Sequence, residues 1–161
     1  MSNETKKTLT VKEASEAYQA LEALIIKDNA NSLIFSGAVR CKLALGLRKT
    51  KPVAELFMNE NNRLVEKYGE EELAPNKDGG DPIKTGRHTI NAKSPNWEKF
   101  REEYKAFAEG DSEVSLQPIA PHELYGVTPE QFNDKDFDPK SCNQLSTELV
   151  AVLYQSGILT E

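Results

Sequence analysis

Apolar residues at helical spacing run from Leu33 to Val65, and they predict a long helix that is interrupted once, at Pro52. Proline lacks the backbone N–H that a helix interior needs and clashes with the carbonyl group four residues before it. We therefore expect either a kinked helix or two helices, the second over residues 53–68. Gly69 follows at the position where a left-handed helix cap is expected.

A second amphipathic helix is predicted before this one, from Thr10 to about Lys27. Thr10 and Glu13 have the S/T-x-x-E spacing of a capping box, and small and apolar residues then recur on one face of the helix. Residues 28–32 are rich in Asp, Asn and Ser, which form turns through their side chains. The pattern predicts two antiparallel helices that form a hairpin-like core.

Residues 70–94 lose the helical periodicity, and turn-forming residues crowd together between Pro75 and Pro82. We expect a loop insertion here. Residues 87–92 contain Thr and Ile and could form a short edge strand within it.

The next helix is predicted to begin at Ser94, with Pro95 at its first helical position, and to stop at Gly110. Trp97 and Tyr104 belong to an aromatic stripe at spacings of three and four residues. The stripe has two interpretations. It packs on the core, or it anchors another subunit, because Trp and Tyr are enriched at the centres of protein interfaces.

The C-terminal part alternates apolar and polar residues over residues 113–119, which predicts a strand near a sheet edge. A short helix is predicted to open at Thr128, and a last helix at Asp138, ending at Gly157. The 161 residues fit a single domain, residues 1–161, with residues 134–161 as a C-terminal helical segment. The expected class is mostly α (α+β), with amphipathic helices, a small edge sheet and a C-terminal helix.

Composition excludes several classes of protein. The net charge of −6 disfavours a surface built throughout to bind nucleic acid. The charge is divided unevenly, with 11 bases and 9 acids in residues 1–70, but 9 bases and 17 acids in residues 71–161. No apolar stretch has the length of a membrane-spanning helix, and two cysteines are too few for a disulfide framework.

An alternation of aspartates resembles the start of a calcium-binding loop. Asp134, Asp136 and Asp138 occupy its first, third and fifth positions, but Pro139 replaces the glycine and Leu145 the bidentate glutamate that such a loop needs. We interpret these aspartates as a solvated turn that caps the last helix.

Residues suited to catalysis are scattered. His88 and His122 lack a Cys or acidic partner at the short spacing of zinc sites. Cys41 lies between two bases, but neighbouring side chains on a helix diverge by about 100°. We expect Cys41 and Cys142 to pack in the core, and we expect no cofactor, no metal and no enzyme activity.

Five bases and no acid lie between residues 40 and 51. Helical geometry places Arg40, Arg48 and Lys51 on one side, and these three residues, with Trp97 and Tyr104, are the candidate partner contacts. The bases could contact nucleic-acid phosphates. The alternative is that their long side chains lie over a core helix and meet acids of a neighbouring element.

The order of features resembles a family of small tailed-phage proteins known only as a domain of unknown function. The resemblance spans residues 10–132 and rests on four segments. They are VRCKLALGLR (39–48), NRLVEKYG (62–69), EVSLQPI (113–119) and GVTPE (126–130). An amphipathic helix precedes the first segment, and Phe100 within an acidic helix lies between the second and the third. The chain differs by its longer Gly/Pro segment and by its additional C-terminal helix. The resemblance implies a phage gene product that serves as a virion or assembly component.

We therefore expect a non-enzymatic bacteriophage structural or assembly protein that contacts other phage structural proteins or copies of itself, in the virion or the host cytoplasm. Residues 70–94 and 134–161 are its expected contact surfaces. An alternative is a phage-encoded binder of a host protein or inhibitor of a defence protein. It would use a cluster of acids: Glu102, Glu103, Glu109, Asp111 and Glu113. A remote alternative is an enzyme that uses a thiol or a histidine.

Overall fold

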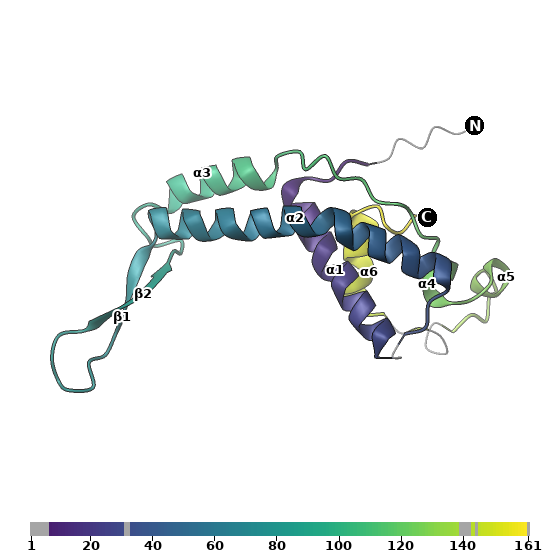
Figure 1. The fold of residues 1–161 in the computed structure, drawn as a ribbon, viewed down its shortest axis with the longest axis horizontal. Coiled ribbons are helices and arrows are strands. Elements are labelled where there is room, and N and C mark those ends of the chain that lie inside the picture. Colours follow the sequence, from purple (N-terminus) through teal and green to yellow (C-terminus); the bar gives the residue numbers. More distant parts are fainter. Residues whose placement is uncertain (1–6, 31–32, 139–142, 144, 161) are drawn as a thin grey trace. The chain divides into compact units, whose positions relative to one another are not determined.

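The computed structural model describes residues 7–30, 33–138, 143 and 145–160, and the mostly α (α+β) class is confirmed. In chain order the elements are α1 (Val11–Asn29), α2 (Gly37–Tyr68), β1 (Glu70–Ala74), β2 (Ile83–Thr89), α3 (Trp97–Ala108), α4 (Pro121–Tyr125), α5 (Pro129–Phe132) and α6 (Thr147–Gln155) (Figure 1). The chain divides into two compact units. The first unit comprises residues 1–55 and 111–161, and the second comprises residues 56–110.

Helix α1 begins as its capping sequence predicts. The Glu13 amide donates to Thr10 Oγ1 at 3.1 Å, and the Thr10 amide donates to Glu13 Oε2 at 2.9 Å. Figure 1 shows α1 crossing α2 rather than running alongside it. The crossing is close, because a Cβ atom built on Gly46 would lie 3.0 Å from a methyl carbon of Leu21. The glycine therefore allows the two helices of the first unit to approach each other.

Helix α2 continues through Pro52 as one helix, so of the two alternatives predicted at Pro52 the division into two helices is wrong. Thr50 and Ala54 on either side of the proline are both buried in the first unit, and this packing stabilises the helix across the break in its hydrogen bonds. The helix also begins at Gly37, later than the predicted start at Leu33. The segment before it is held in a non-helical form, with the Phe35 amide donating to the carboxylate of Asp28.

The main hydrophobic core lies in the first unit. Its members come from both ends of the chain, and α1 packs against α6. The large apolar side chains with less than 2% exposure in this unit are Leu9, Leu21, Leu24, Leu33, Val39, Leu43, Ile119, Leu124, Leu153 and Ile158.

The strand predicted over residues 113–119 does not form. The segment has no continuous ladder: isolated bridges join Thr10 with Asp111, just before it, and Ile119 with Leu159, and the Leu9 amide donates to the Val114 carbonyl at 2.9 Å. Glu113 adopts a left-handed conformation with φ of 58°, and its amide donates to the Asp111 carboxylate at 2.7 Å. This local turn replaces the regular strand geometry that the alternating pattern suggested.

The predicted helix at Thr128 is confirmed as α5, which Thr128 caps. Helix α6 begins at Thr147, where Ser146 caps it and accepts a hydrogen bond from the Leu149 amide. The prediction of a helix that opens at Asp138 and is capped by the aspartates concerns residues 139–142, which lie outside the described residues. Asp134 accepts a hydrogen bond from the Asp136 amide at 3.0 Å. Pro139 lies outside the described residues.

Gly157 follows α6 with a left-handed φ of 71°, as the sequence predicts for a residue that ends a helix. In the second unit, α3 begins at Trp97 rather than at Ser94. Ser94 is buried, and its hydroxyl accepts a hydrogen bond from the Asn91 amide, so it stabilises the turn before the helix instead of capping it.

Candidate interaction surface

The predicted loop over residues 70–94 contains an antiparallel β-hairpin, so its description as a loop is wrong. β1 and β2 pair with Glu70 opposite Thr89 and Ala74 opposite Ile83. The strand predicted at residues 87–92 lies earlier, at 83–89. The hairpin projects away from α2 and α3 of the second unit (Figure 1).

An irregularity in the hairpin places extra residues in β2. Glu71 pairs with His88, but Leu73, two residues later, pairs with Lys84. The Thr85 hydroxyl donates to the Glu72 carbonyl at 3.0 Å and accepts a hydrogen bond from the Arg87 amide. Gly86 completes the bulge with φ of +74°, a conformation that other residues rarely adopt.

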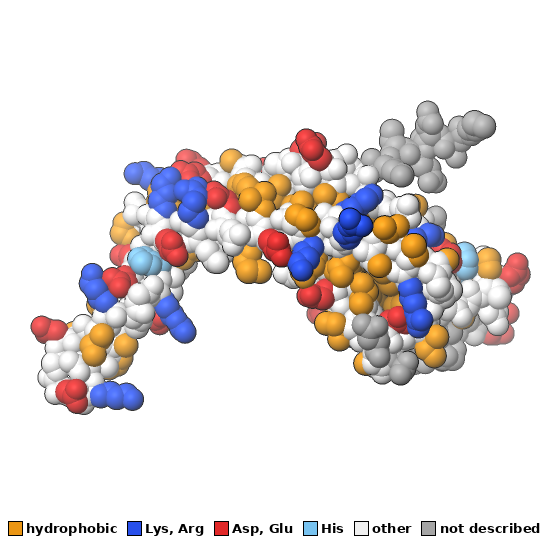
Figure 2. Space-filling model, viewed as in Figure 1, with side chains coloured by type: hydrophobic (Ala, Val, Ile, Leu, Met, Phe, Trp, Pro, Cys, Tyr) orange, Lys and Arg blue, Asp and Glu red, His pale blue; other side chains and the backbone are white. Residues whose placement is uncertain are grey.

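No side chain of either strand is buried, which is the main feature of the hairpin. Leu73 is 57% exposed and Ile83 is 55% exposed. Figure 2 shows hydrophobic side chains and charged side chains of both signs on the surface of this hairpin. Its apolar side chains therefore add little to the folding of the isolated chain and remain available for contact with another molecule.

The two strands carry opposite charge. β1 contains three consecutive glutamates, whereas β2 contains Lys84, Arg87 and His88 and no acid. Lys84 Nζ lies 3.1 Å from Glu71 Oε2, and this hydrogen bond lowers the pKa of the Glu71 carboxyl. Among the described residues, the side chains of three charged strand residues make no hydrogen bond or ion pair: Glu70, Glu72 and Arg87.

Gly69 joins the end of α2 to the hairpin through a close approach of two backbones. A Cβ atom at this position would collide with the carbonyl oxygen of Val65 and would lie 2.8 Å from that of Thr89. Gly69 does not have the positive φ of a left-handed cap, so that prediction is wrong. The glycine is required because the end of β2 lies directly against the last turn of the helix.

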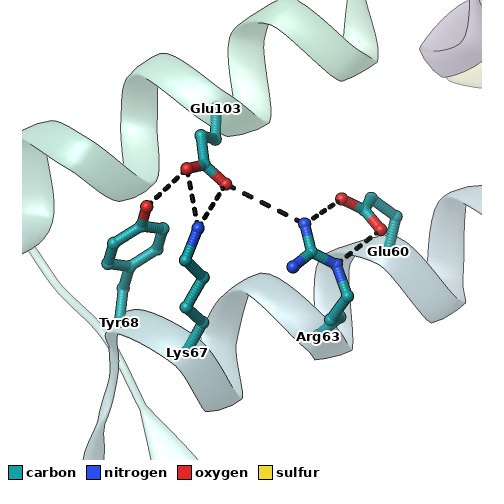
Figure 3. Close-up of polar contacts among 5 residues, drawn as sticks. All are labelled: Glu60, Arg63, Lys67, Tyr68 and Glu103. Atoms are coloured by element: carbon teal, nitrogen blue, oxygen red, sulfur yellow. Dashed lines mark hydrogen bonds and ion pairs between the residues drawn. The ribbon is translucent and has the colours of Figure 1, made fainter.

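A polar network fixes α3 against the end of α2 from which the hairpin begins (Figure 3). Glu103 of α3 accepts hydrogen bonds from Lys67 Nζ at 2.8 Å and from the Tyr68 hydroxyl at 2.5 Å. Arg63 lies 3.9 Å from Glu103 and forms a shorter pair with Glu60. The hydrogen bonds from Lys67 and then Tyr68 lower the pKa of the Glu103 carboxyl.

The predicted aromatic stripe lies in the second unit, where its rings contact one another. Trp97 stacks on Phe100, and Phe100 stacks on Tyr104, with ring centres 5.6 and 5.8 Å apart. Phe57 of α2 packs edge-on against Tyr104 and stacks on Phe107. Phe100 is buried, whereas Trp97 and Tyr104 are half-buried, so both candidate contacts keep an exposed part.

The predicted basic contacts lie on α2 in the first unit, and they do not share one environment. Arg40 forms an ion pair with Asp28 at 2.8 Å, and Lys51 lies 4.0 Å from Glu55. Arg48 is exposed and its side chain makes no ion pair among the described residues. The other two bases meet first-unit residues: Lys42 pairs with Glu123, and Lys49 donates to the Ser115 carbonyl.

The predicted acidic cluster is divided between the two units, because Asp111 and Glu113 belong to the first. In the second unit Glu103 takes part in the polar network described above, and Glu109 lies 3.9 Å from Lys105. Glu102 is exposed. Several of these acids therefore already serve contacts within their own unit.

Cys41 is exposed on α2, so the prediction that it packs in the core is wrong, while Cys142 lies outside the described residues. The stripe of apolar residues on α2 faces away from position 41. His122 lines a shallow pocket of about 590 Å³ in the first unit, and His88 lines one of about 450 Å³ in the second. Cys41 lines neither of these two pockets.

Within the described ranges, no group of three or more His, Cys, Asp or Glu residues is arranged to hold a metal ion. The helices in this part of the chain are all too short or too polar to span a bilayer. No protein-family model, curated protein or solved structure matches the chain.

Proposed function

We propose that this chain is a non-enzymatic structural or assembly protein of a bacteriophage particle and that it acts through protein–protein contacts made by the β1–β2 hairpin. The observation that carries the proposal is the exposure of the hairpin, none of whose strand residues is buried. The phage origin rests on the resemblance of residues 10–132. The virion and the host cytoplasm are the locations that this role requires.

An isolated two-stranded hairpin is only marginally stable in water, and open strand edges invite pairing with other chains. This hairpin has both features, and it also exposes Leu73 and Ile83 on neighbouring strands. Association would cover the apolar side chains and satisfy the free backbone groups of an edge. A contact function explains why the chain carries such an element.

The base of the hairpin is held firmly, which favours a binding role over a loose linker. The backbone of β2 meets the last turn of α2 at Gly69, and the Glu103 network fixes α3 beside the same turn. A binding element that is held in one geometry loses less entropy on association than a free loop.

Mass spectrometry of purified particles and assembly intermediates tests the proposal. A double substitution, L73D/I83D, places charge on two exposed side chains and should reduce incorporation into particles without unfolding the protein. Met58→Asp is the matched control, because Met58 is 61% exposed in the same unit but lies on α2.

The proposed function is wrong if the protein is absent from particles and from assembly intermediates. Recovery of the chain with host proteins alone would instead favour the role of a host-directed binder. Equal incorporation of the wild type and L73D/I83D would remove the hairpin as the contact surface.

A further inference from the structure

We propose that the partner of the hairpin is a second copy of this chain, with the acidic β1 edge of one copy pairing with the basic β2 edge of the next. The inference rests on the proposed function for its biological setting, since it names the partner that the hairpin contacts. Its physical basis is the separation of charge between the two strands.

Each strand has one paired edge and one open edge. The described sheet has two strands, β1 and β2, and they bond only to each other. The open side of β1 borders three glutamates, and the open side of β2 borders Lys84, Arg87 and His88. Strand addition at such an edge supplies backbone hydrogen bonds, and the side chains beside it decide which strand is accepted.

The charged side chains without a partner among the described residues are divided between the two strands of the sheet. Side chains alternate along a strand, so Glu70 and Glu72 share a face. Glu70 pairs with Thr89, which places Thr89 on this same face, and Arg87 lies two residues before Thr89 at the edge of the bulge. The opposite face holds Glu71 and Lys84, which already form an ion pair. The hairpin therefore offers two free acids on the β1 strand and one free base on the β2 strand.

Pairing between unlike edges is favoured over pairing between like edges. Pairing of two β1 edges would bring the glutamates of both copies together. Pairing of two β2 edges would bring together Lys84 and Arg87 of both copies. Both arrangements are unfavourable, because like charges directly opposite each other destabilise a sheet. Pairing of β2 with the β1 of the next copy places Arg87 beside Glu70 and Glu72. Such a contact joins different surfaces of the two copies, so it produces a closed ring or an open filament rather than a two-fold dimer.

A second copy is the occupant that the hairpin itself specifies, because one hairpin contains both complementary edges. A strand from an unrelated protein would have to match one edge and would leave the other open. Pairing between copies uses both edges and brings neighbouring strands alongside the exposed Ile83 and Leu73. The same contact therefore accounts for the charge, the open edges and the exposed apolar side chains.

Sedimentation velocity of the full chain over a range of concentrations tests the proposal. The wild type should form species larger than a dimer, and high salt should weaken them because the contact charges are exposed. Glu72→Lys and Arg87→Glu should each raise the dissociation constant about five- to tenfold, since each replaces an attraction across the contact by a repulsion.

Matched control variants separate the hairpin from net charge. Glu102→Lys and Lys99→Glu make the same changes of charge at exposed positions of α3 in the same unit, where neither side chain has an ion pair among the described residues. These two variants should associate like the wild type. Circular dichroism of all four variants verifies that each has folded.

A mixture of the two hairpin variants gives the decisive result. In the mixture, the lysine at position 72 of one variant faces the glutamate at position 87 of the other, and the second contact keeps the wild-type charges. The mixture should therefore recover the large species that each variant forms poorly alone. A wild type that stays monomeric at every concentration, or controls that dissociate as readily as the hairpin variants, would overturn the inference.

The test also separates this inference from the proposed function. Presence of a monomeric protein in particles would leave the function intact and refute pairing between copies. If the mixture of variants recovers the large species but the protein is absent from particles and assembly intermediates, pairing between copies is supported and the proposed function is refuted.

Discussion

The carboxylate of Asp28 holds the guanidinium group of Arg40 by two contacts across the connection between α1 and α2. Arg40 Nε lies 2.8 Å from Asp28 Oδ2, and Arg40 Nη2 lies 3.1 Å from Oδ1. The Asp28 side chain is only 9% exposed, whereas that of Arg40 is 55% exposed. Asp28 also accepts the Phe35 amide at 3.3 Å, so one carboxylate of α1 binds both the segment before α2 and the first turn of α2.

Asp28→Ala should therefore lower the free energy of unfolding by about 2–3 kcal/mol, because it leaves a buried amide without its acceptor. Arg40→Ala should cost about 1 kcal/mol or less, because its guanidinium group remains accessible to water. Urea denaturation measures both values. Equal losses in the two variants would show that the ion pair, and not the bond to Phe35, provides the stability.

Asn143→Ala should detach the segment before α6 from the rest of the first unit. Asn143 accepts the Ile34 amide at 2.9 Å and donates to the carbonyls of Ile34 and Leu124 at 2.8 and 3.1 Å. Loss of these three bonds should lower the free energy of unfolding by about 2 kcal/mol. Asn133→Ala, at an exposed helix end, is the control and should change it by less than about 0.5 kcal/mol. Limited proteolysis should cut Asn143→Ala first in its C-terminal segment.

Glu113→Gly should stabilise the protein. Glu113 has φ of 58°, in the left-handed region where a side chain costs energy and glycine does not. The free energy of unfolding should rise by up to about 1 kcal/mol, after the larger conformational entropy that glycine gives the unfolded chain is subtracted. Gly126→Ala makes the reverse change at φ of 73° and should cost about 1 kcal/mol. If the thermal unfolding midpoints of both variants move in the same direction, the left-handed backbone conformation does not determine the effect of these substitutions.

Acid should weaken the second unit through Glu103. Hydrogen bonds from Lys67 and then Tyr68 lower the pKa of this carboxyl below its usual value of 4.5. Because the pKa of Glu103 is lower in the folded state than in the unfolded state, its contribution to stability is complete above the unfolded-state pKa. This contribution is lost as the pH falls through the folded-state pKa. Trp97, the only tryptophan in the chain, reports the unfolding of this unit by fluorescence. Glu103→Gln should be less stable at neutral pH and should show a smaller loss of stability on acidification.

The sequence predicts the helices well where local chemistry decides them. The capping box of Thr10 with Glu13 and the cap at Thr128 depend on residues three positions apart, and both form as expected. The prediction over residues 113–119 is wrong because a period of two does not reveal the left-handed turn at Glu113.

The sequence does not predict the hairpin, because nearly all residues of its strands are exposed. Without a buried face there is no alternation of apolar and polar residues to find, and the pairing of Glu70 with Thr89 joins positions far apart in sequence. The separation of acids in β1 from bases in β2 is the signal that could have indicated it. The bonds of Asp28 and Asn143 likewise depend on tertiary contacts that no local pattern contains.

Most of the large buried side chains lie in the first unit, and this distribution predicts which parts of the chain unfold locally and which unfold only with the main core. In the second unit Leu64 and Phe100 are the large apolar side chains that are buried among the described residues. Hydrogen exchange should therefore be slow for the amides of α1, which open only when the main core unfolds. It should be fast for the amides of the hairpin, which open locally. Assembly would slow exchange in the hairpin alone, so amide protection can report association without any label.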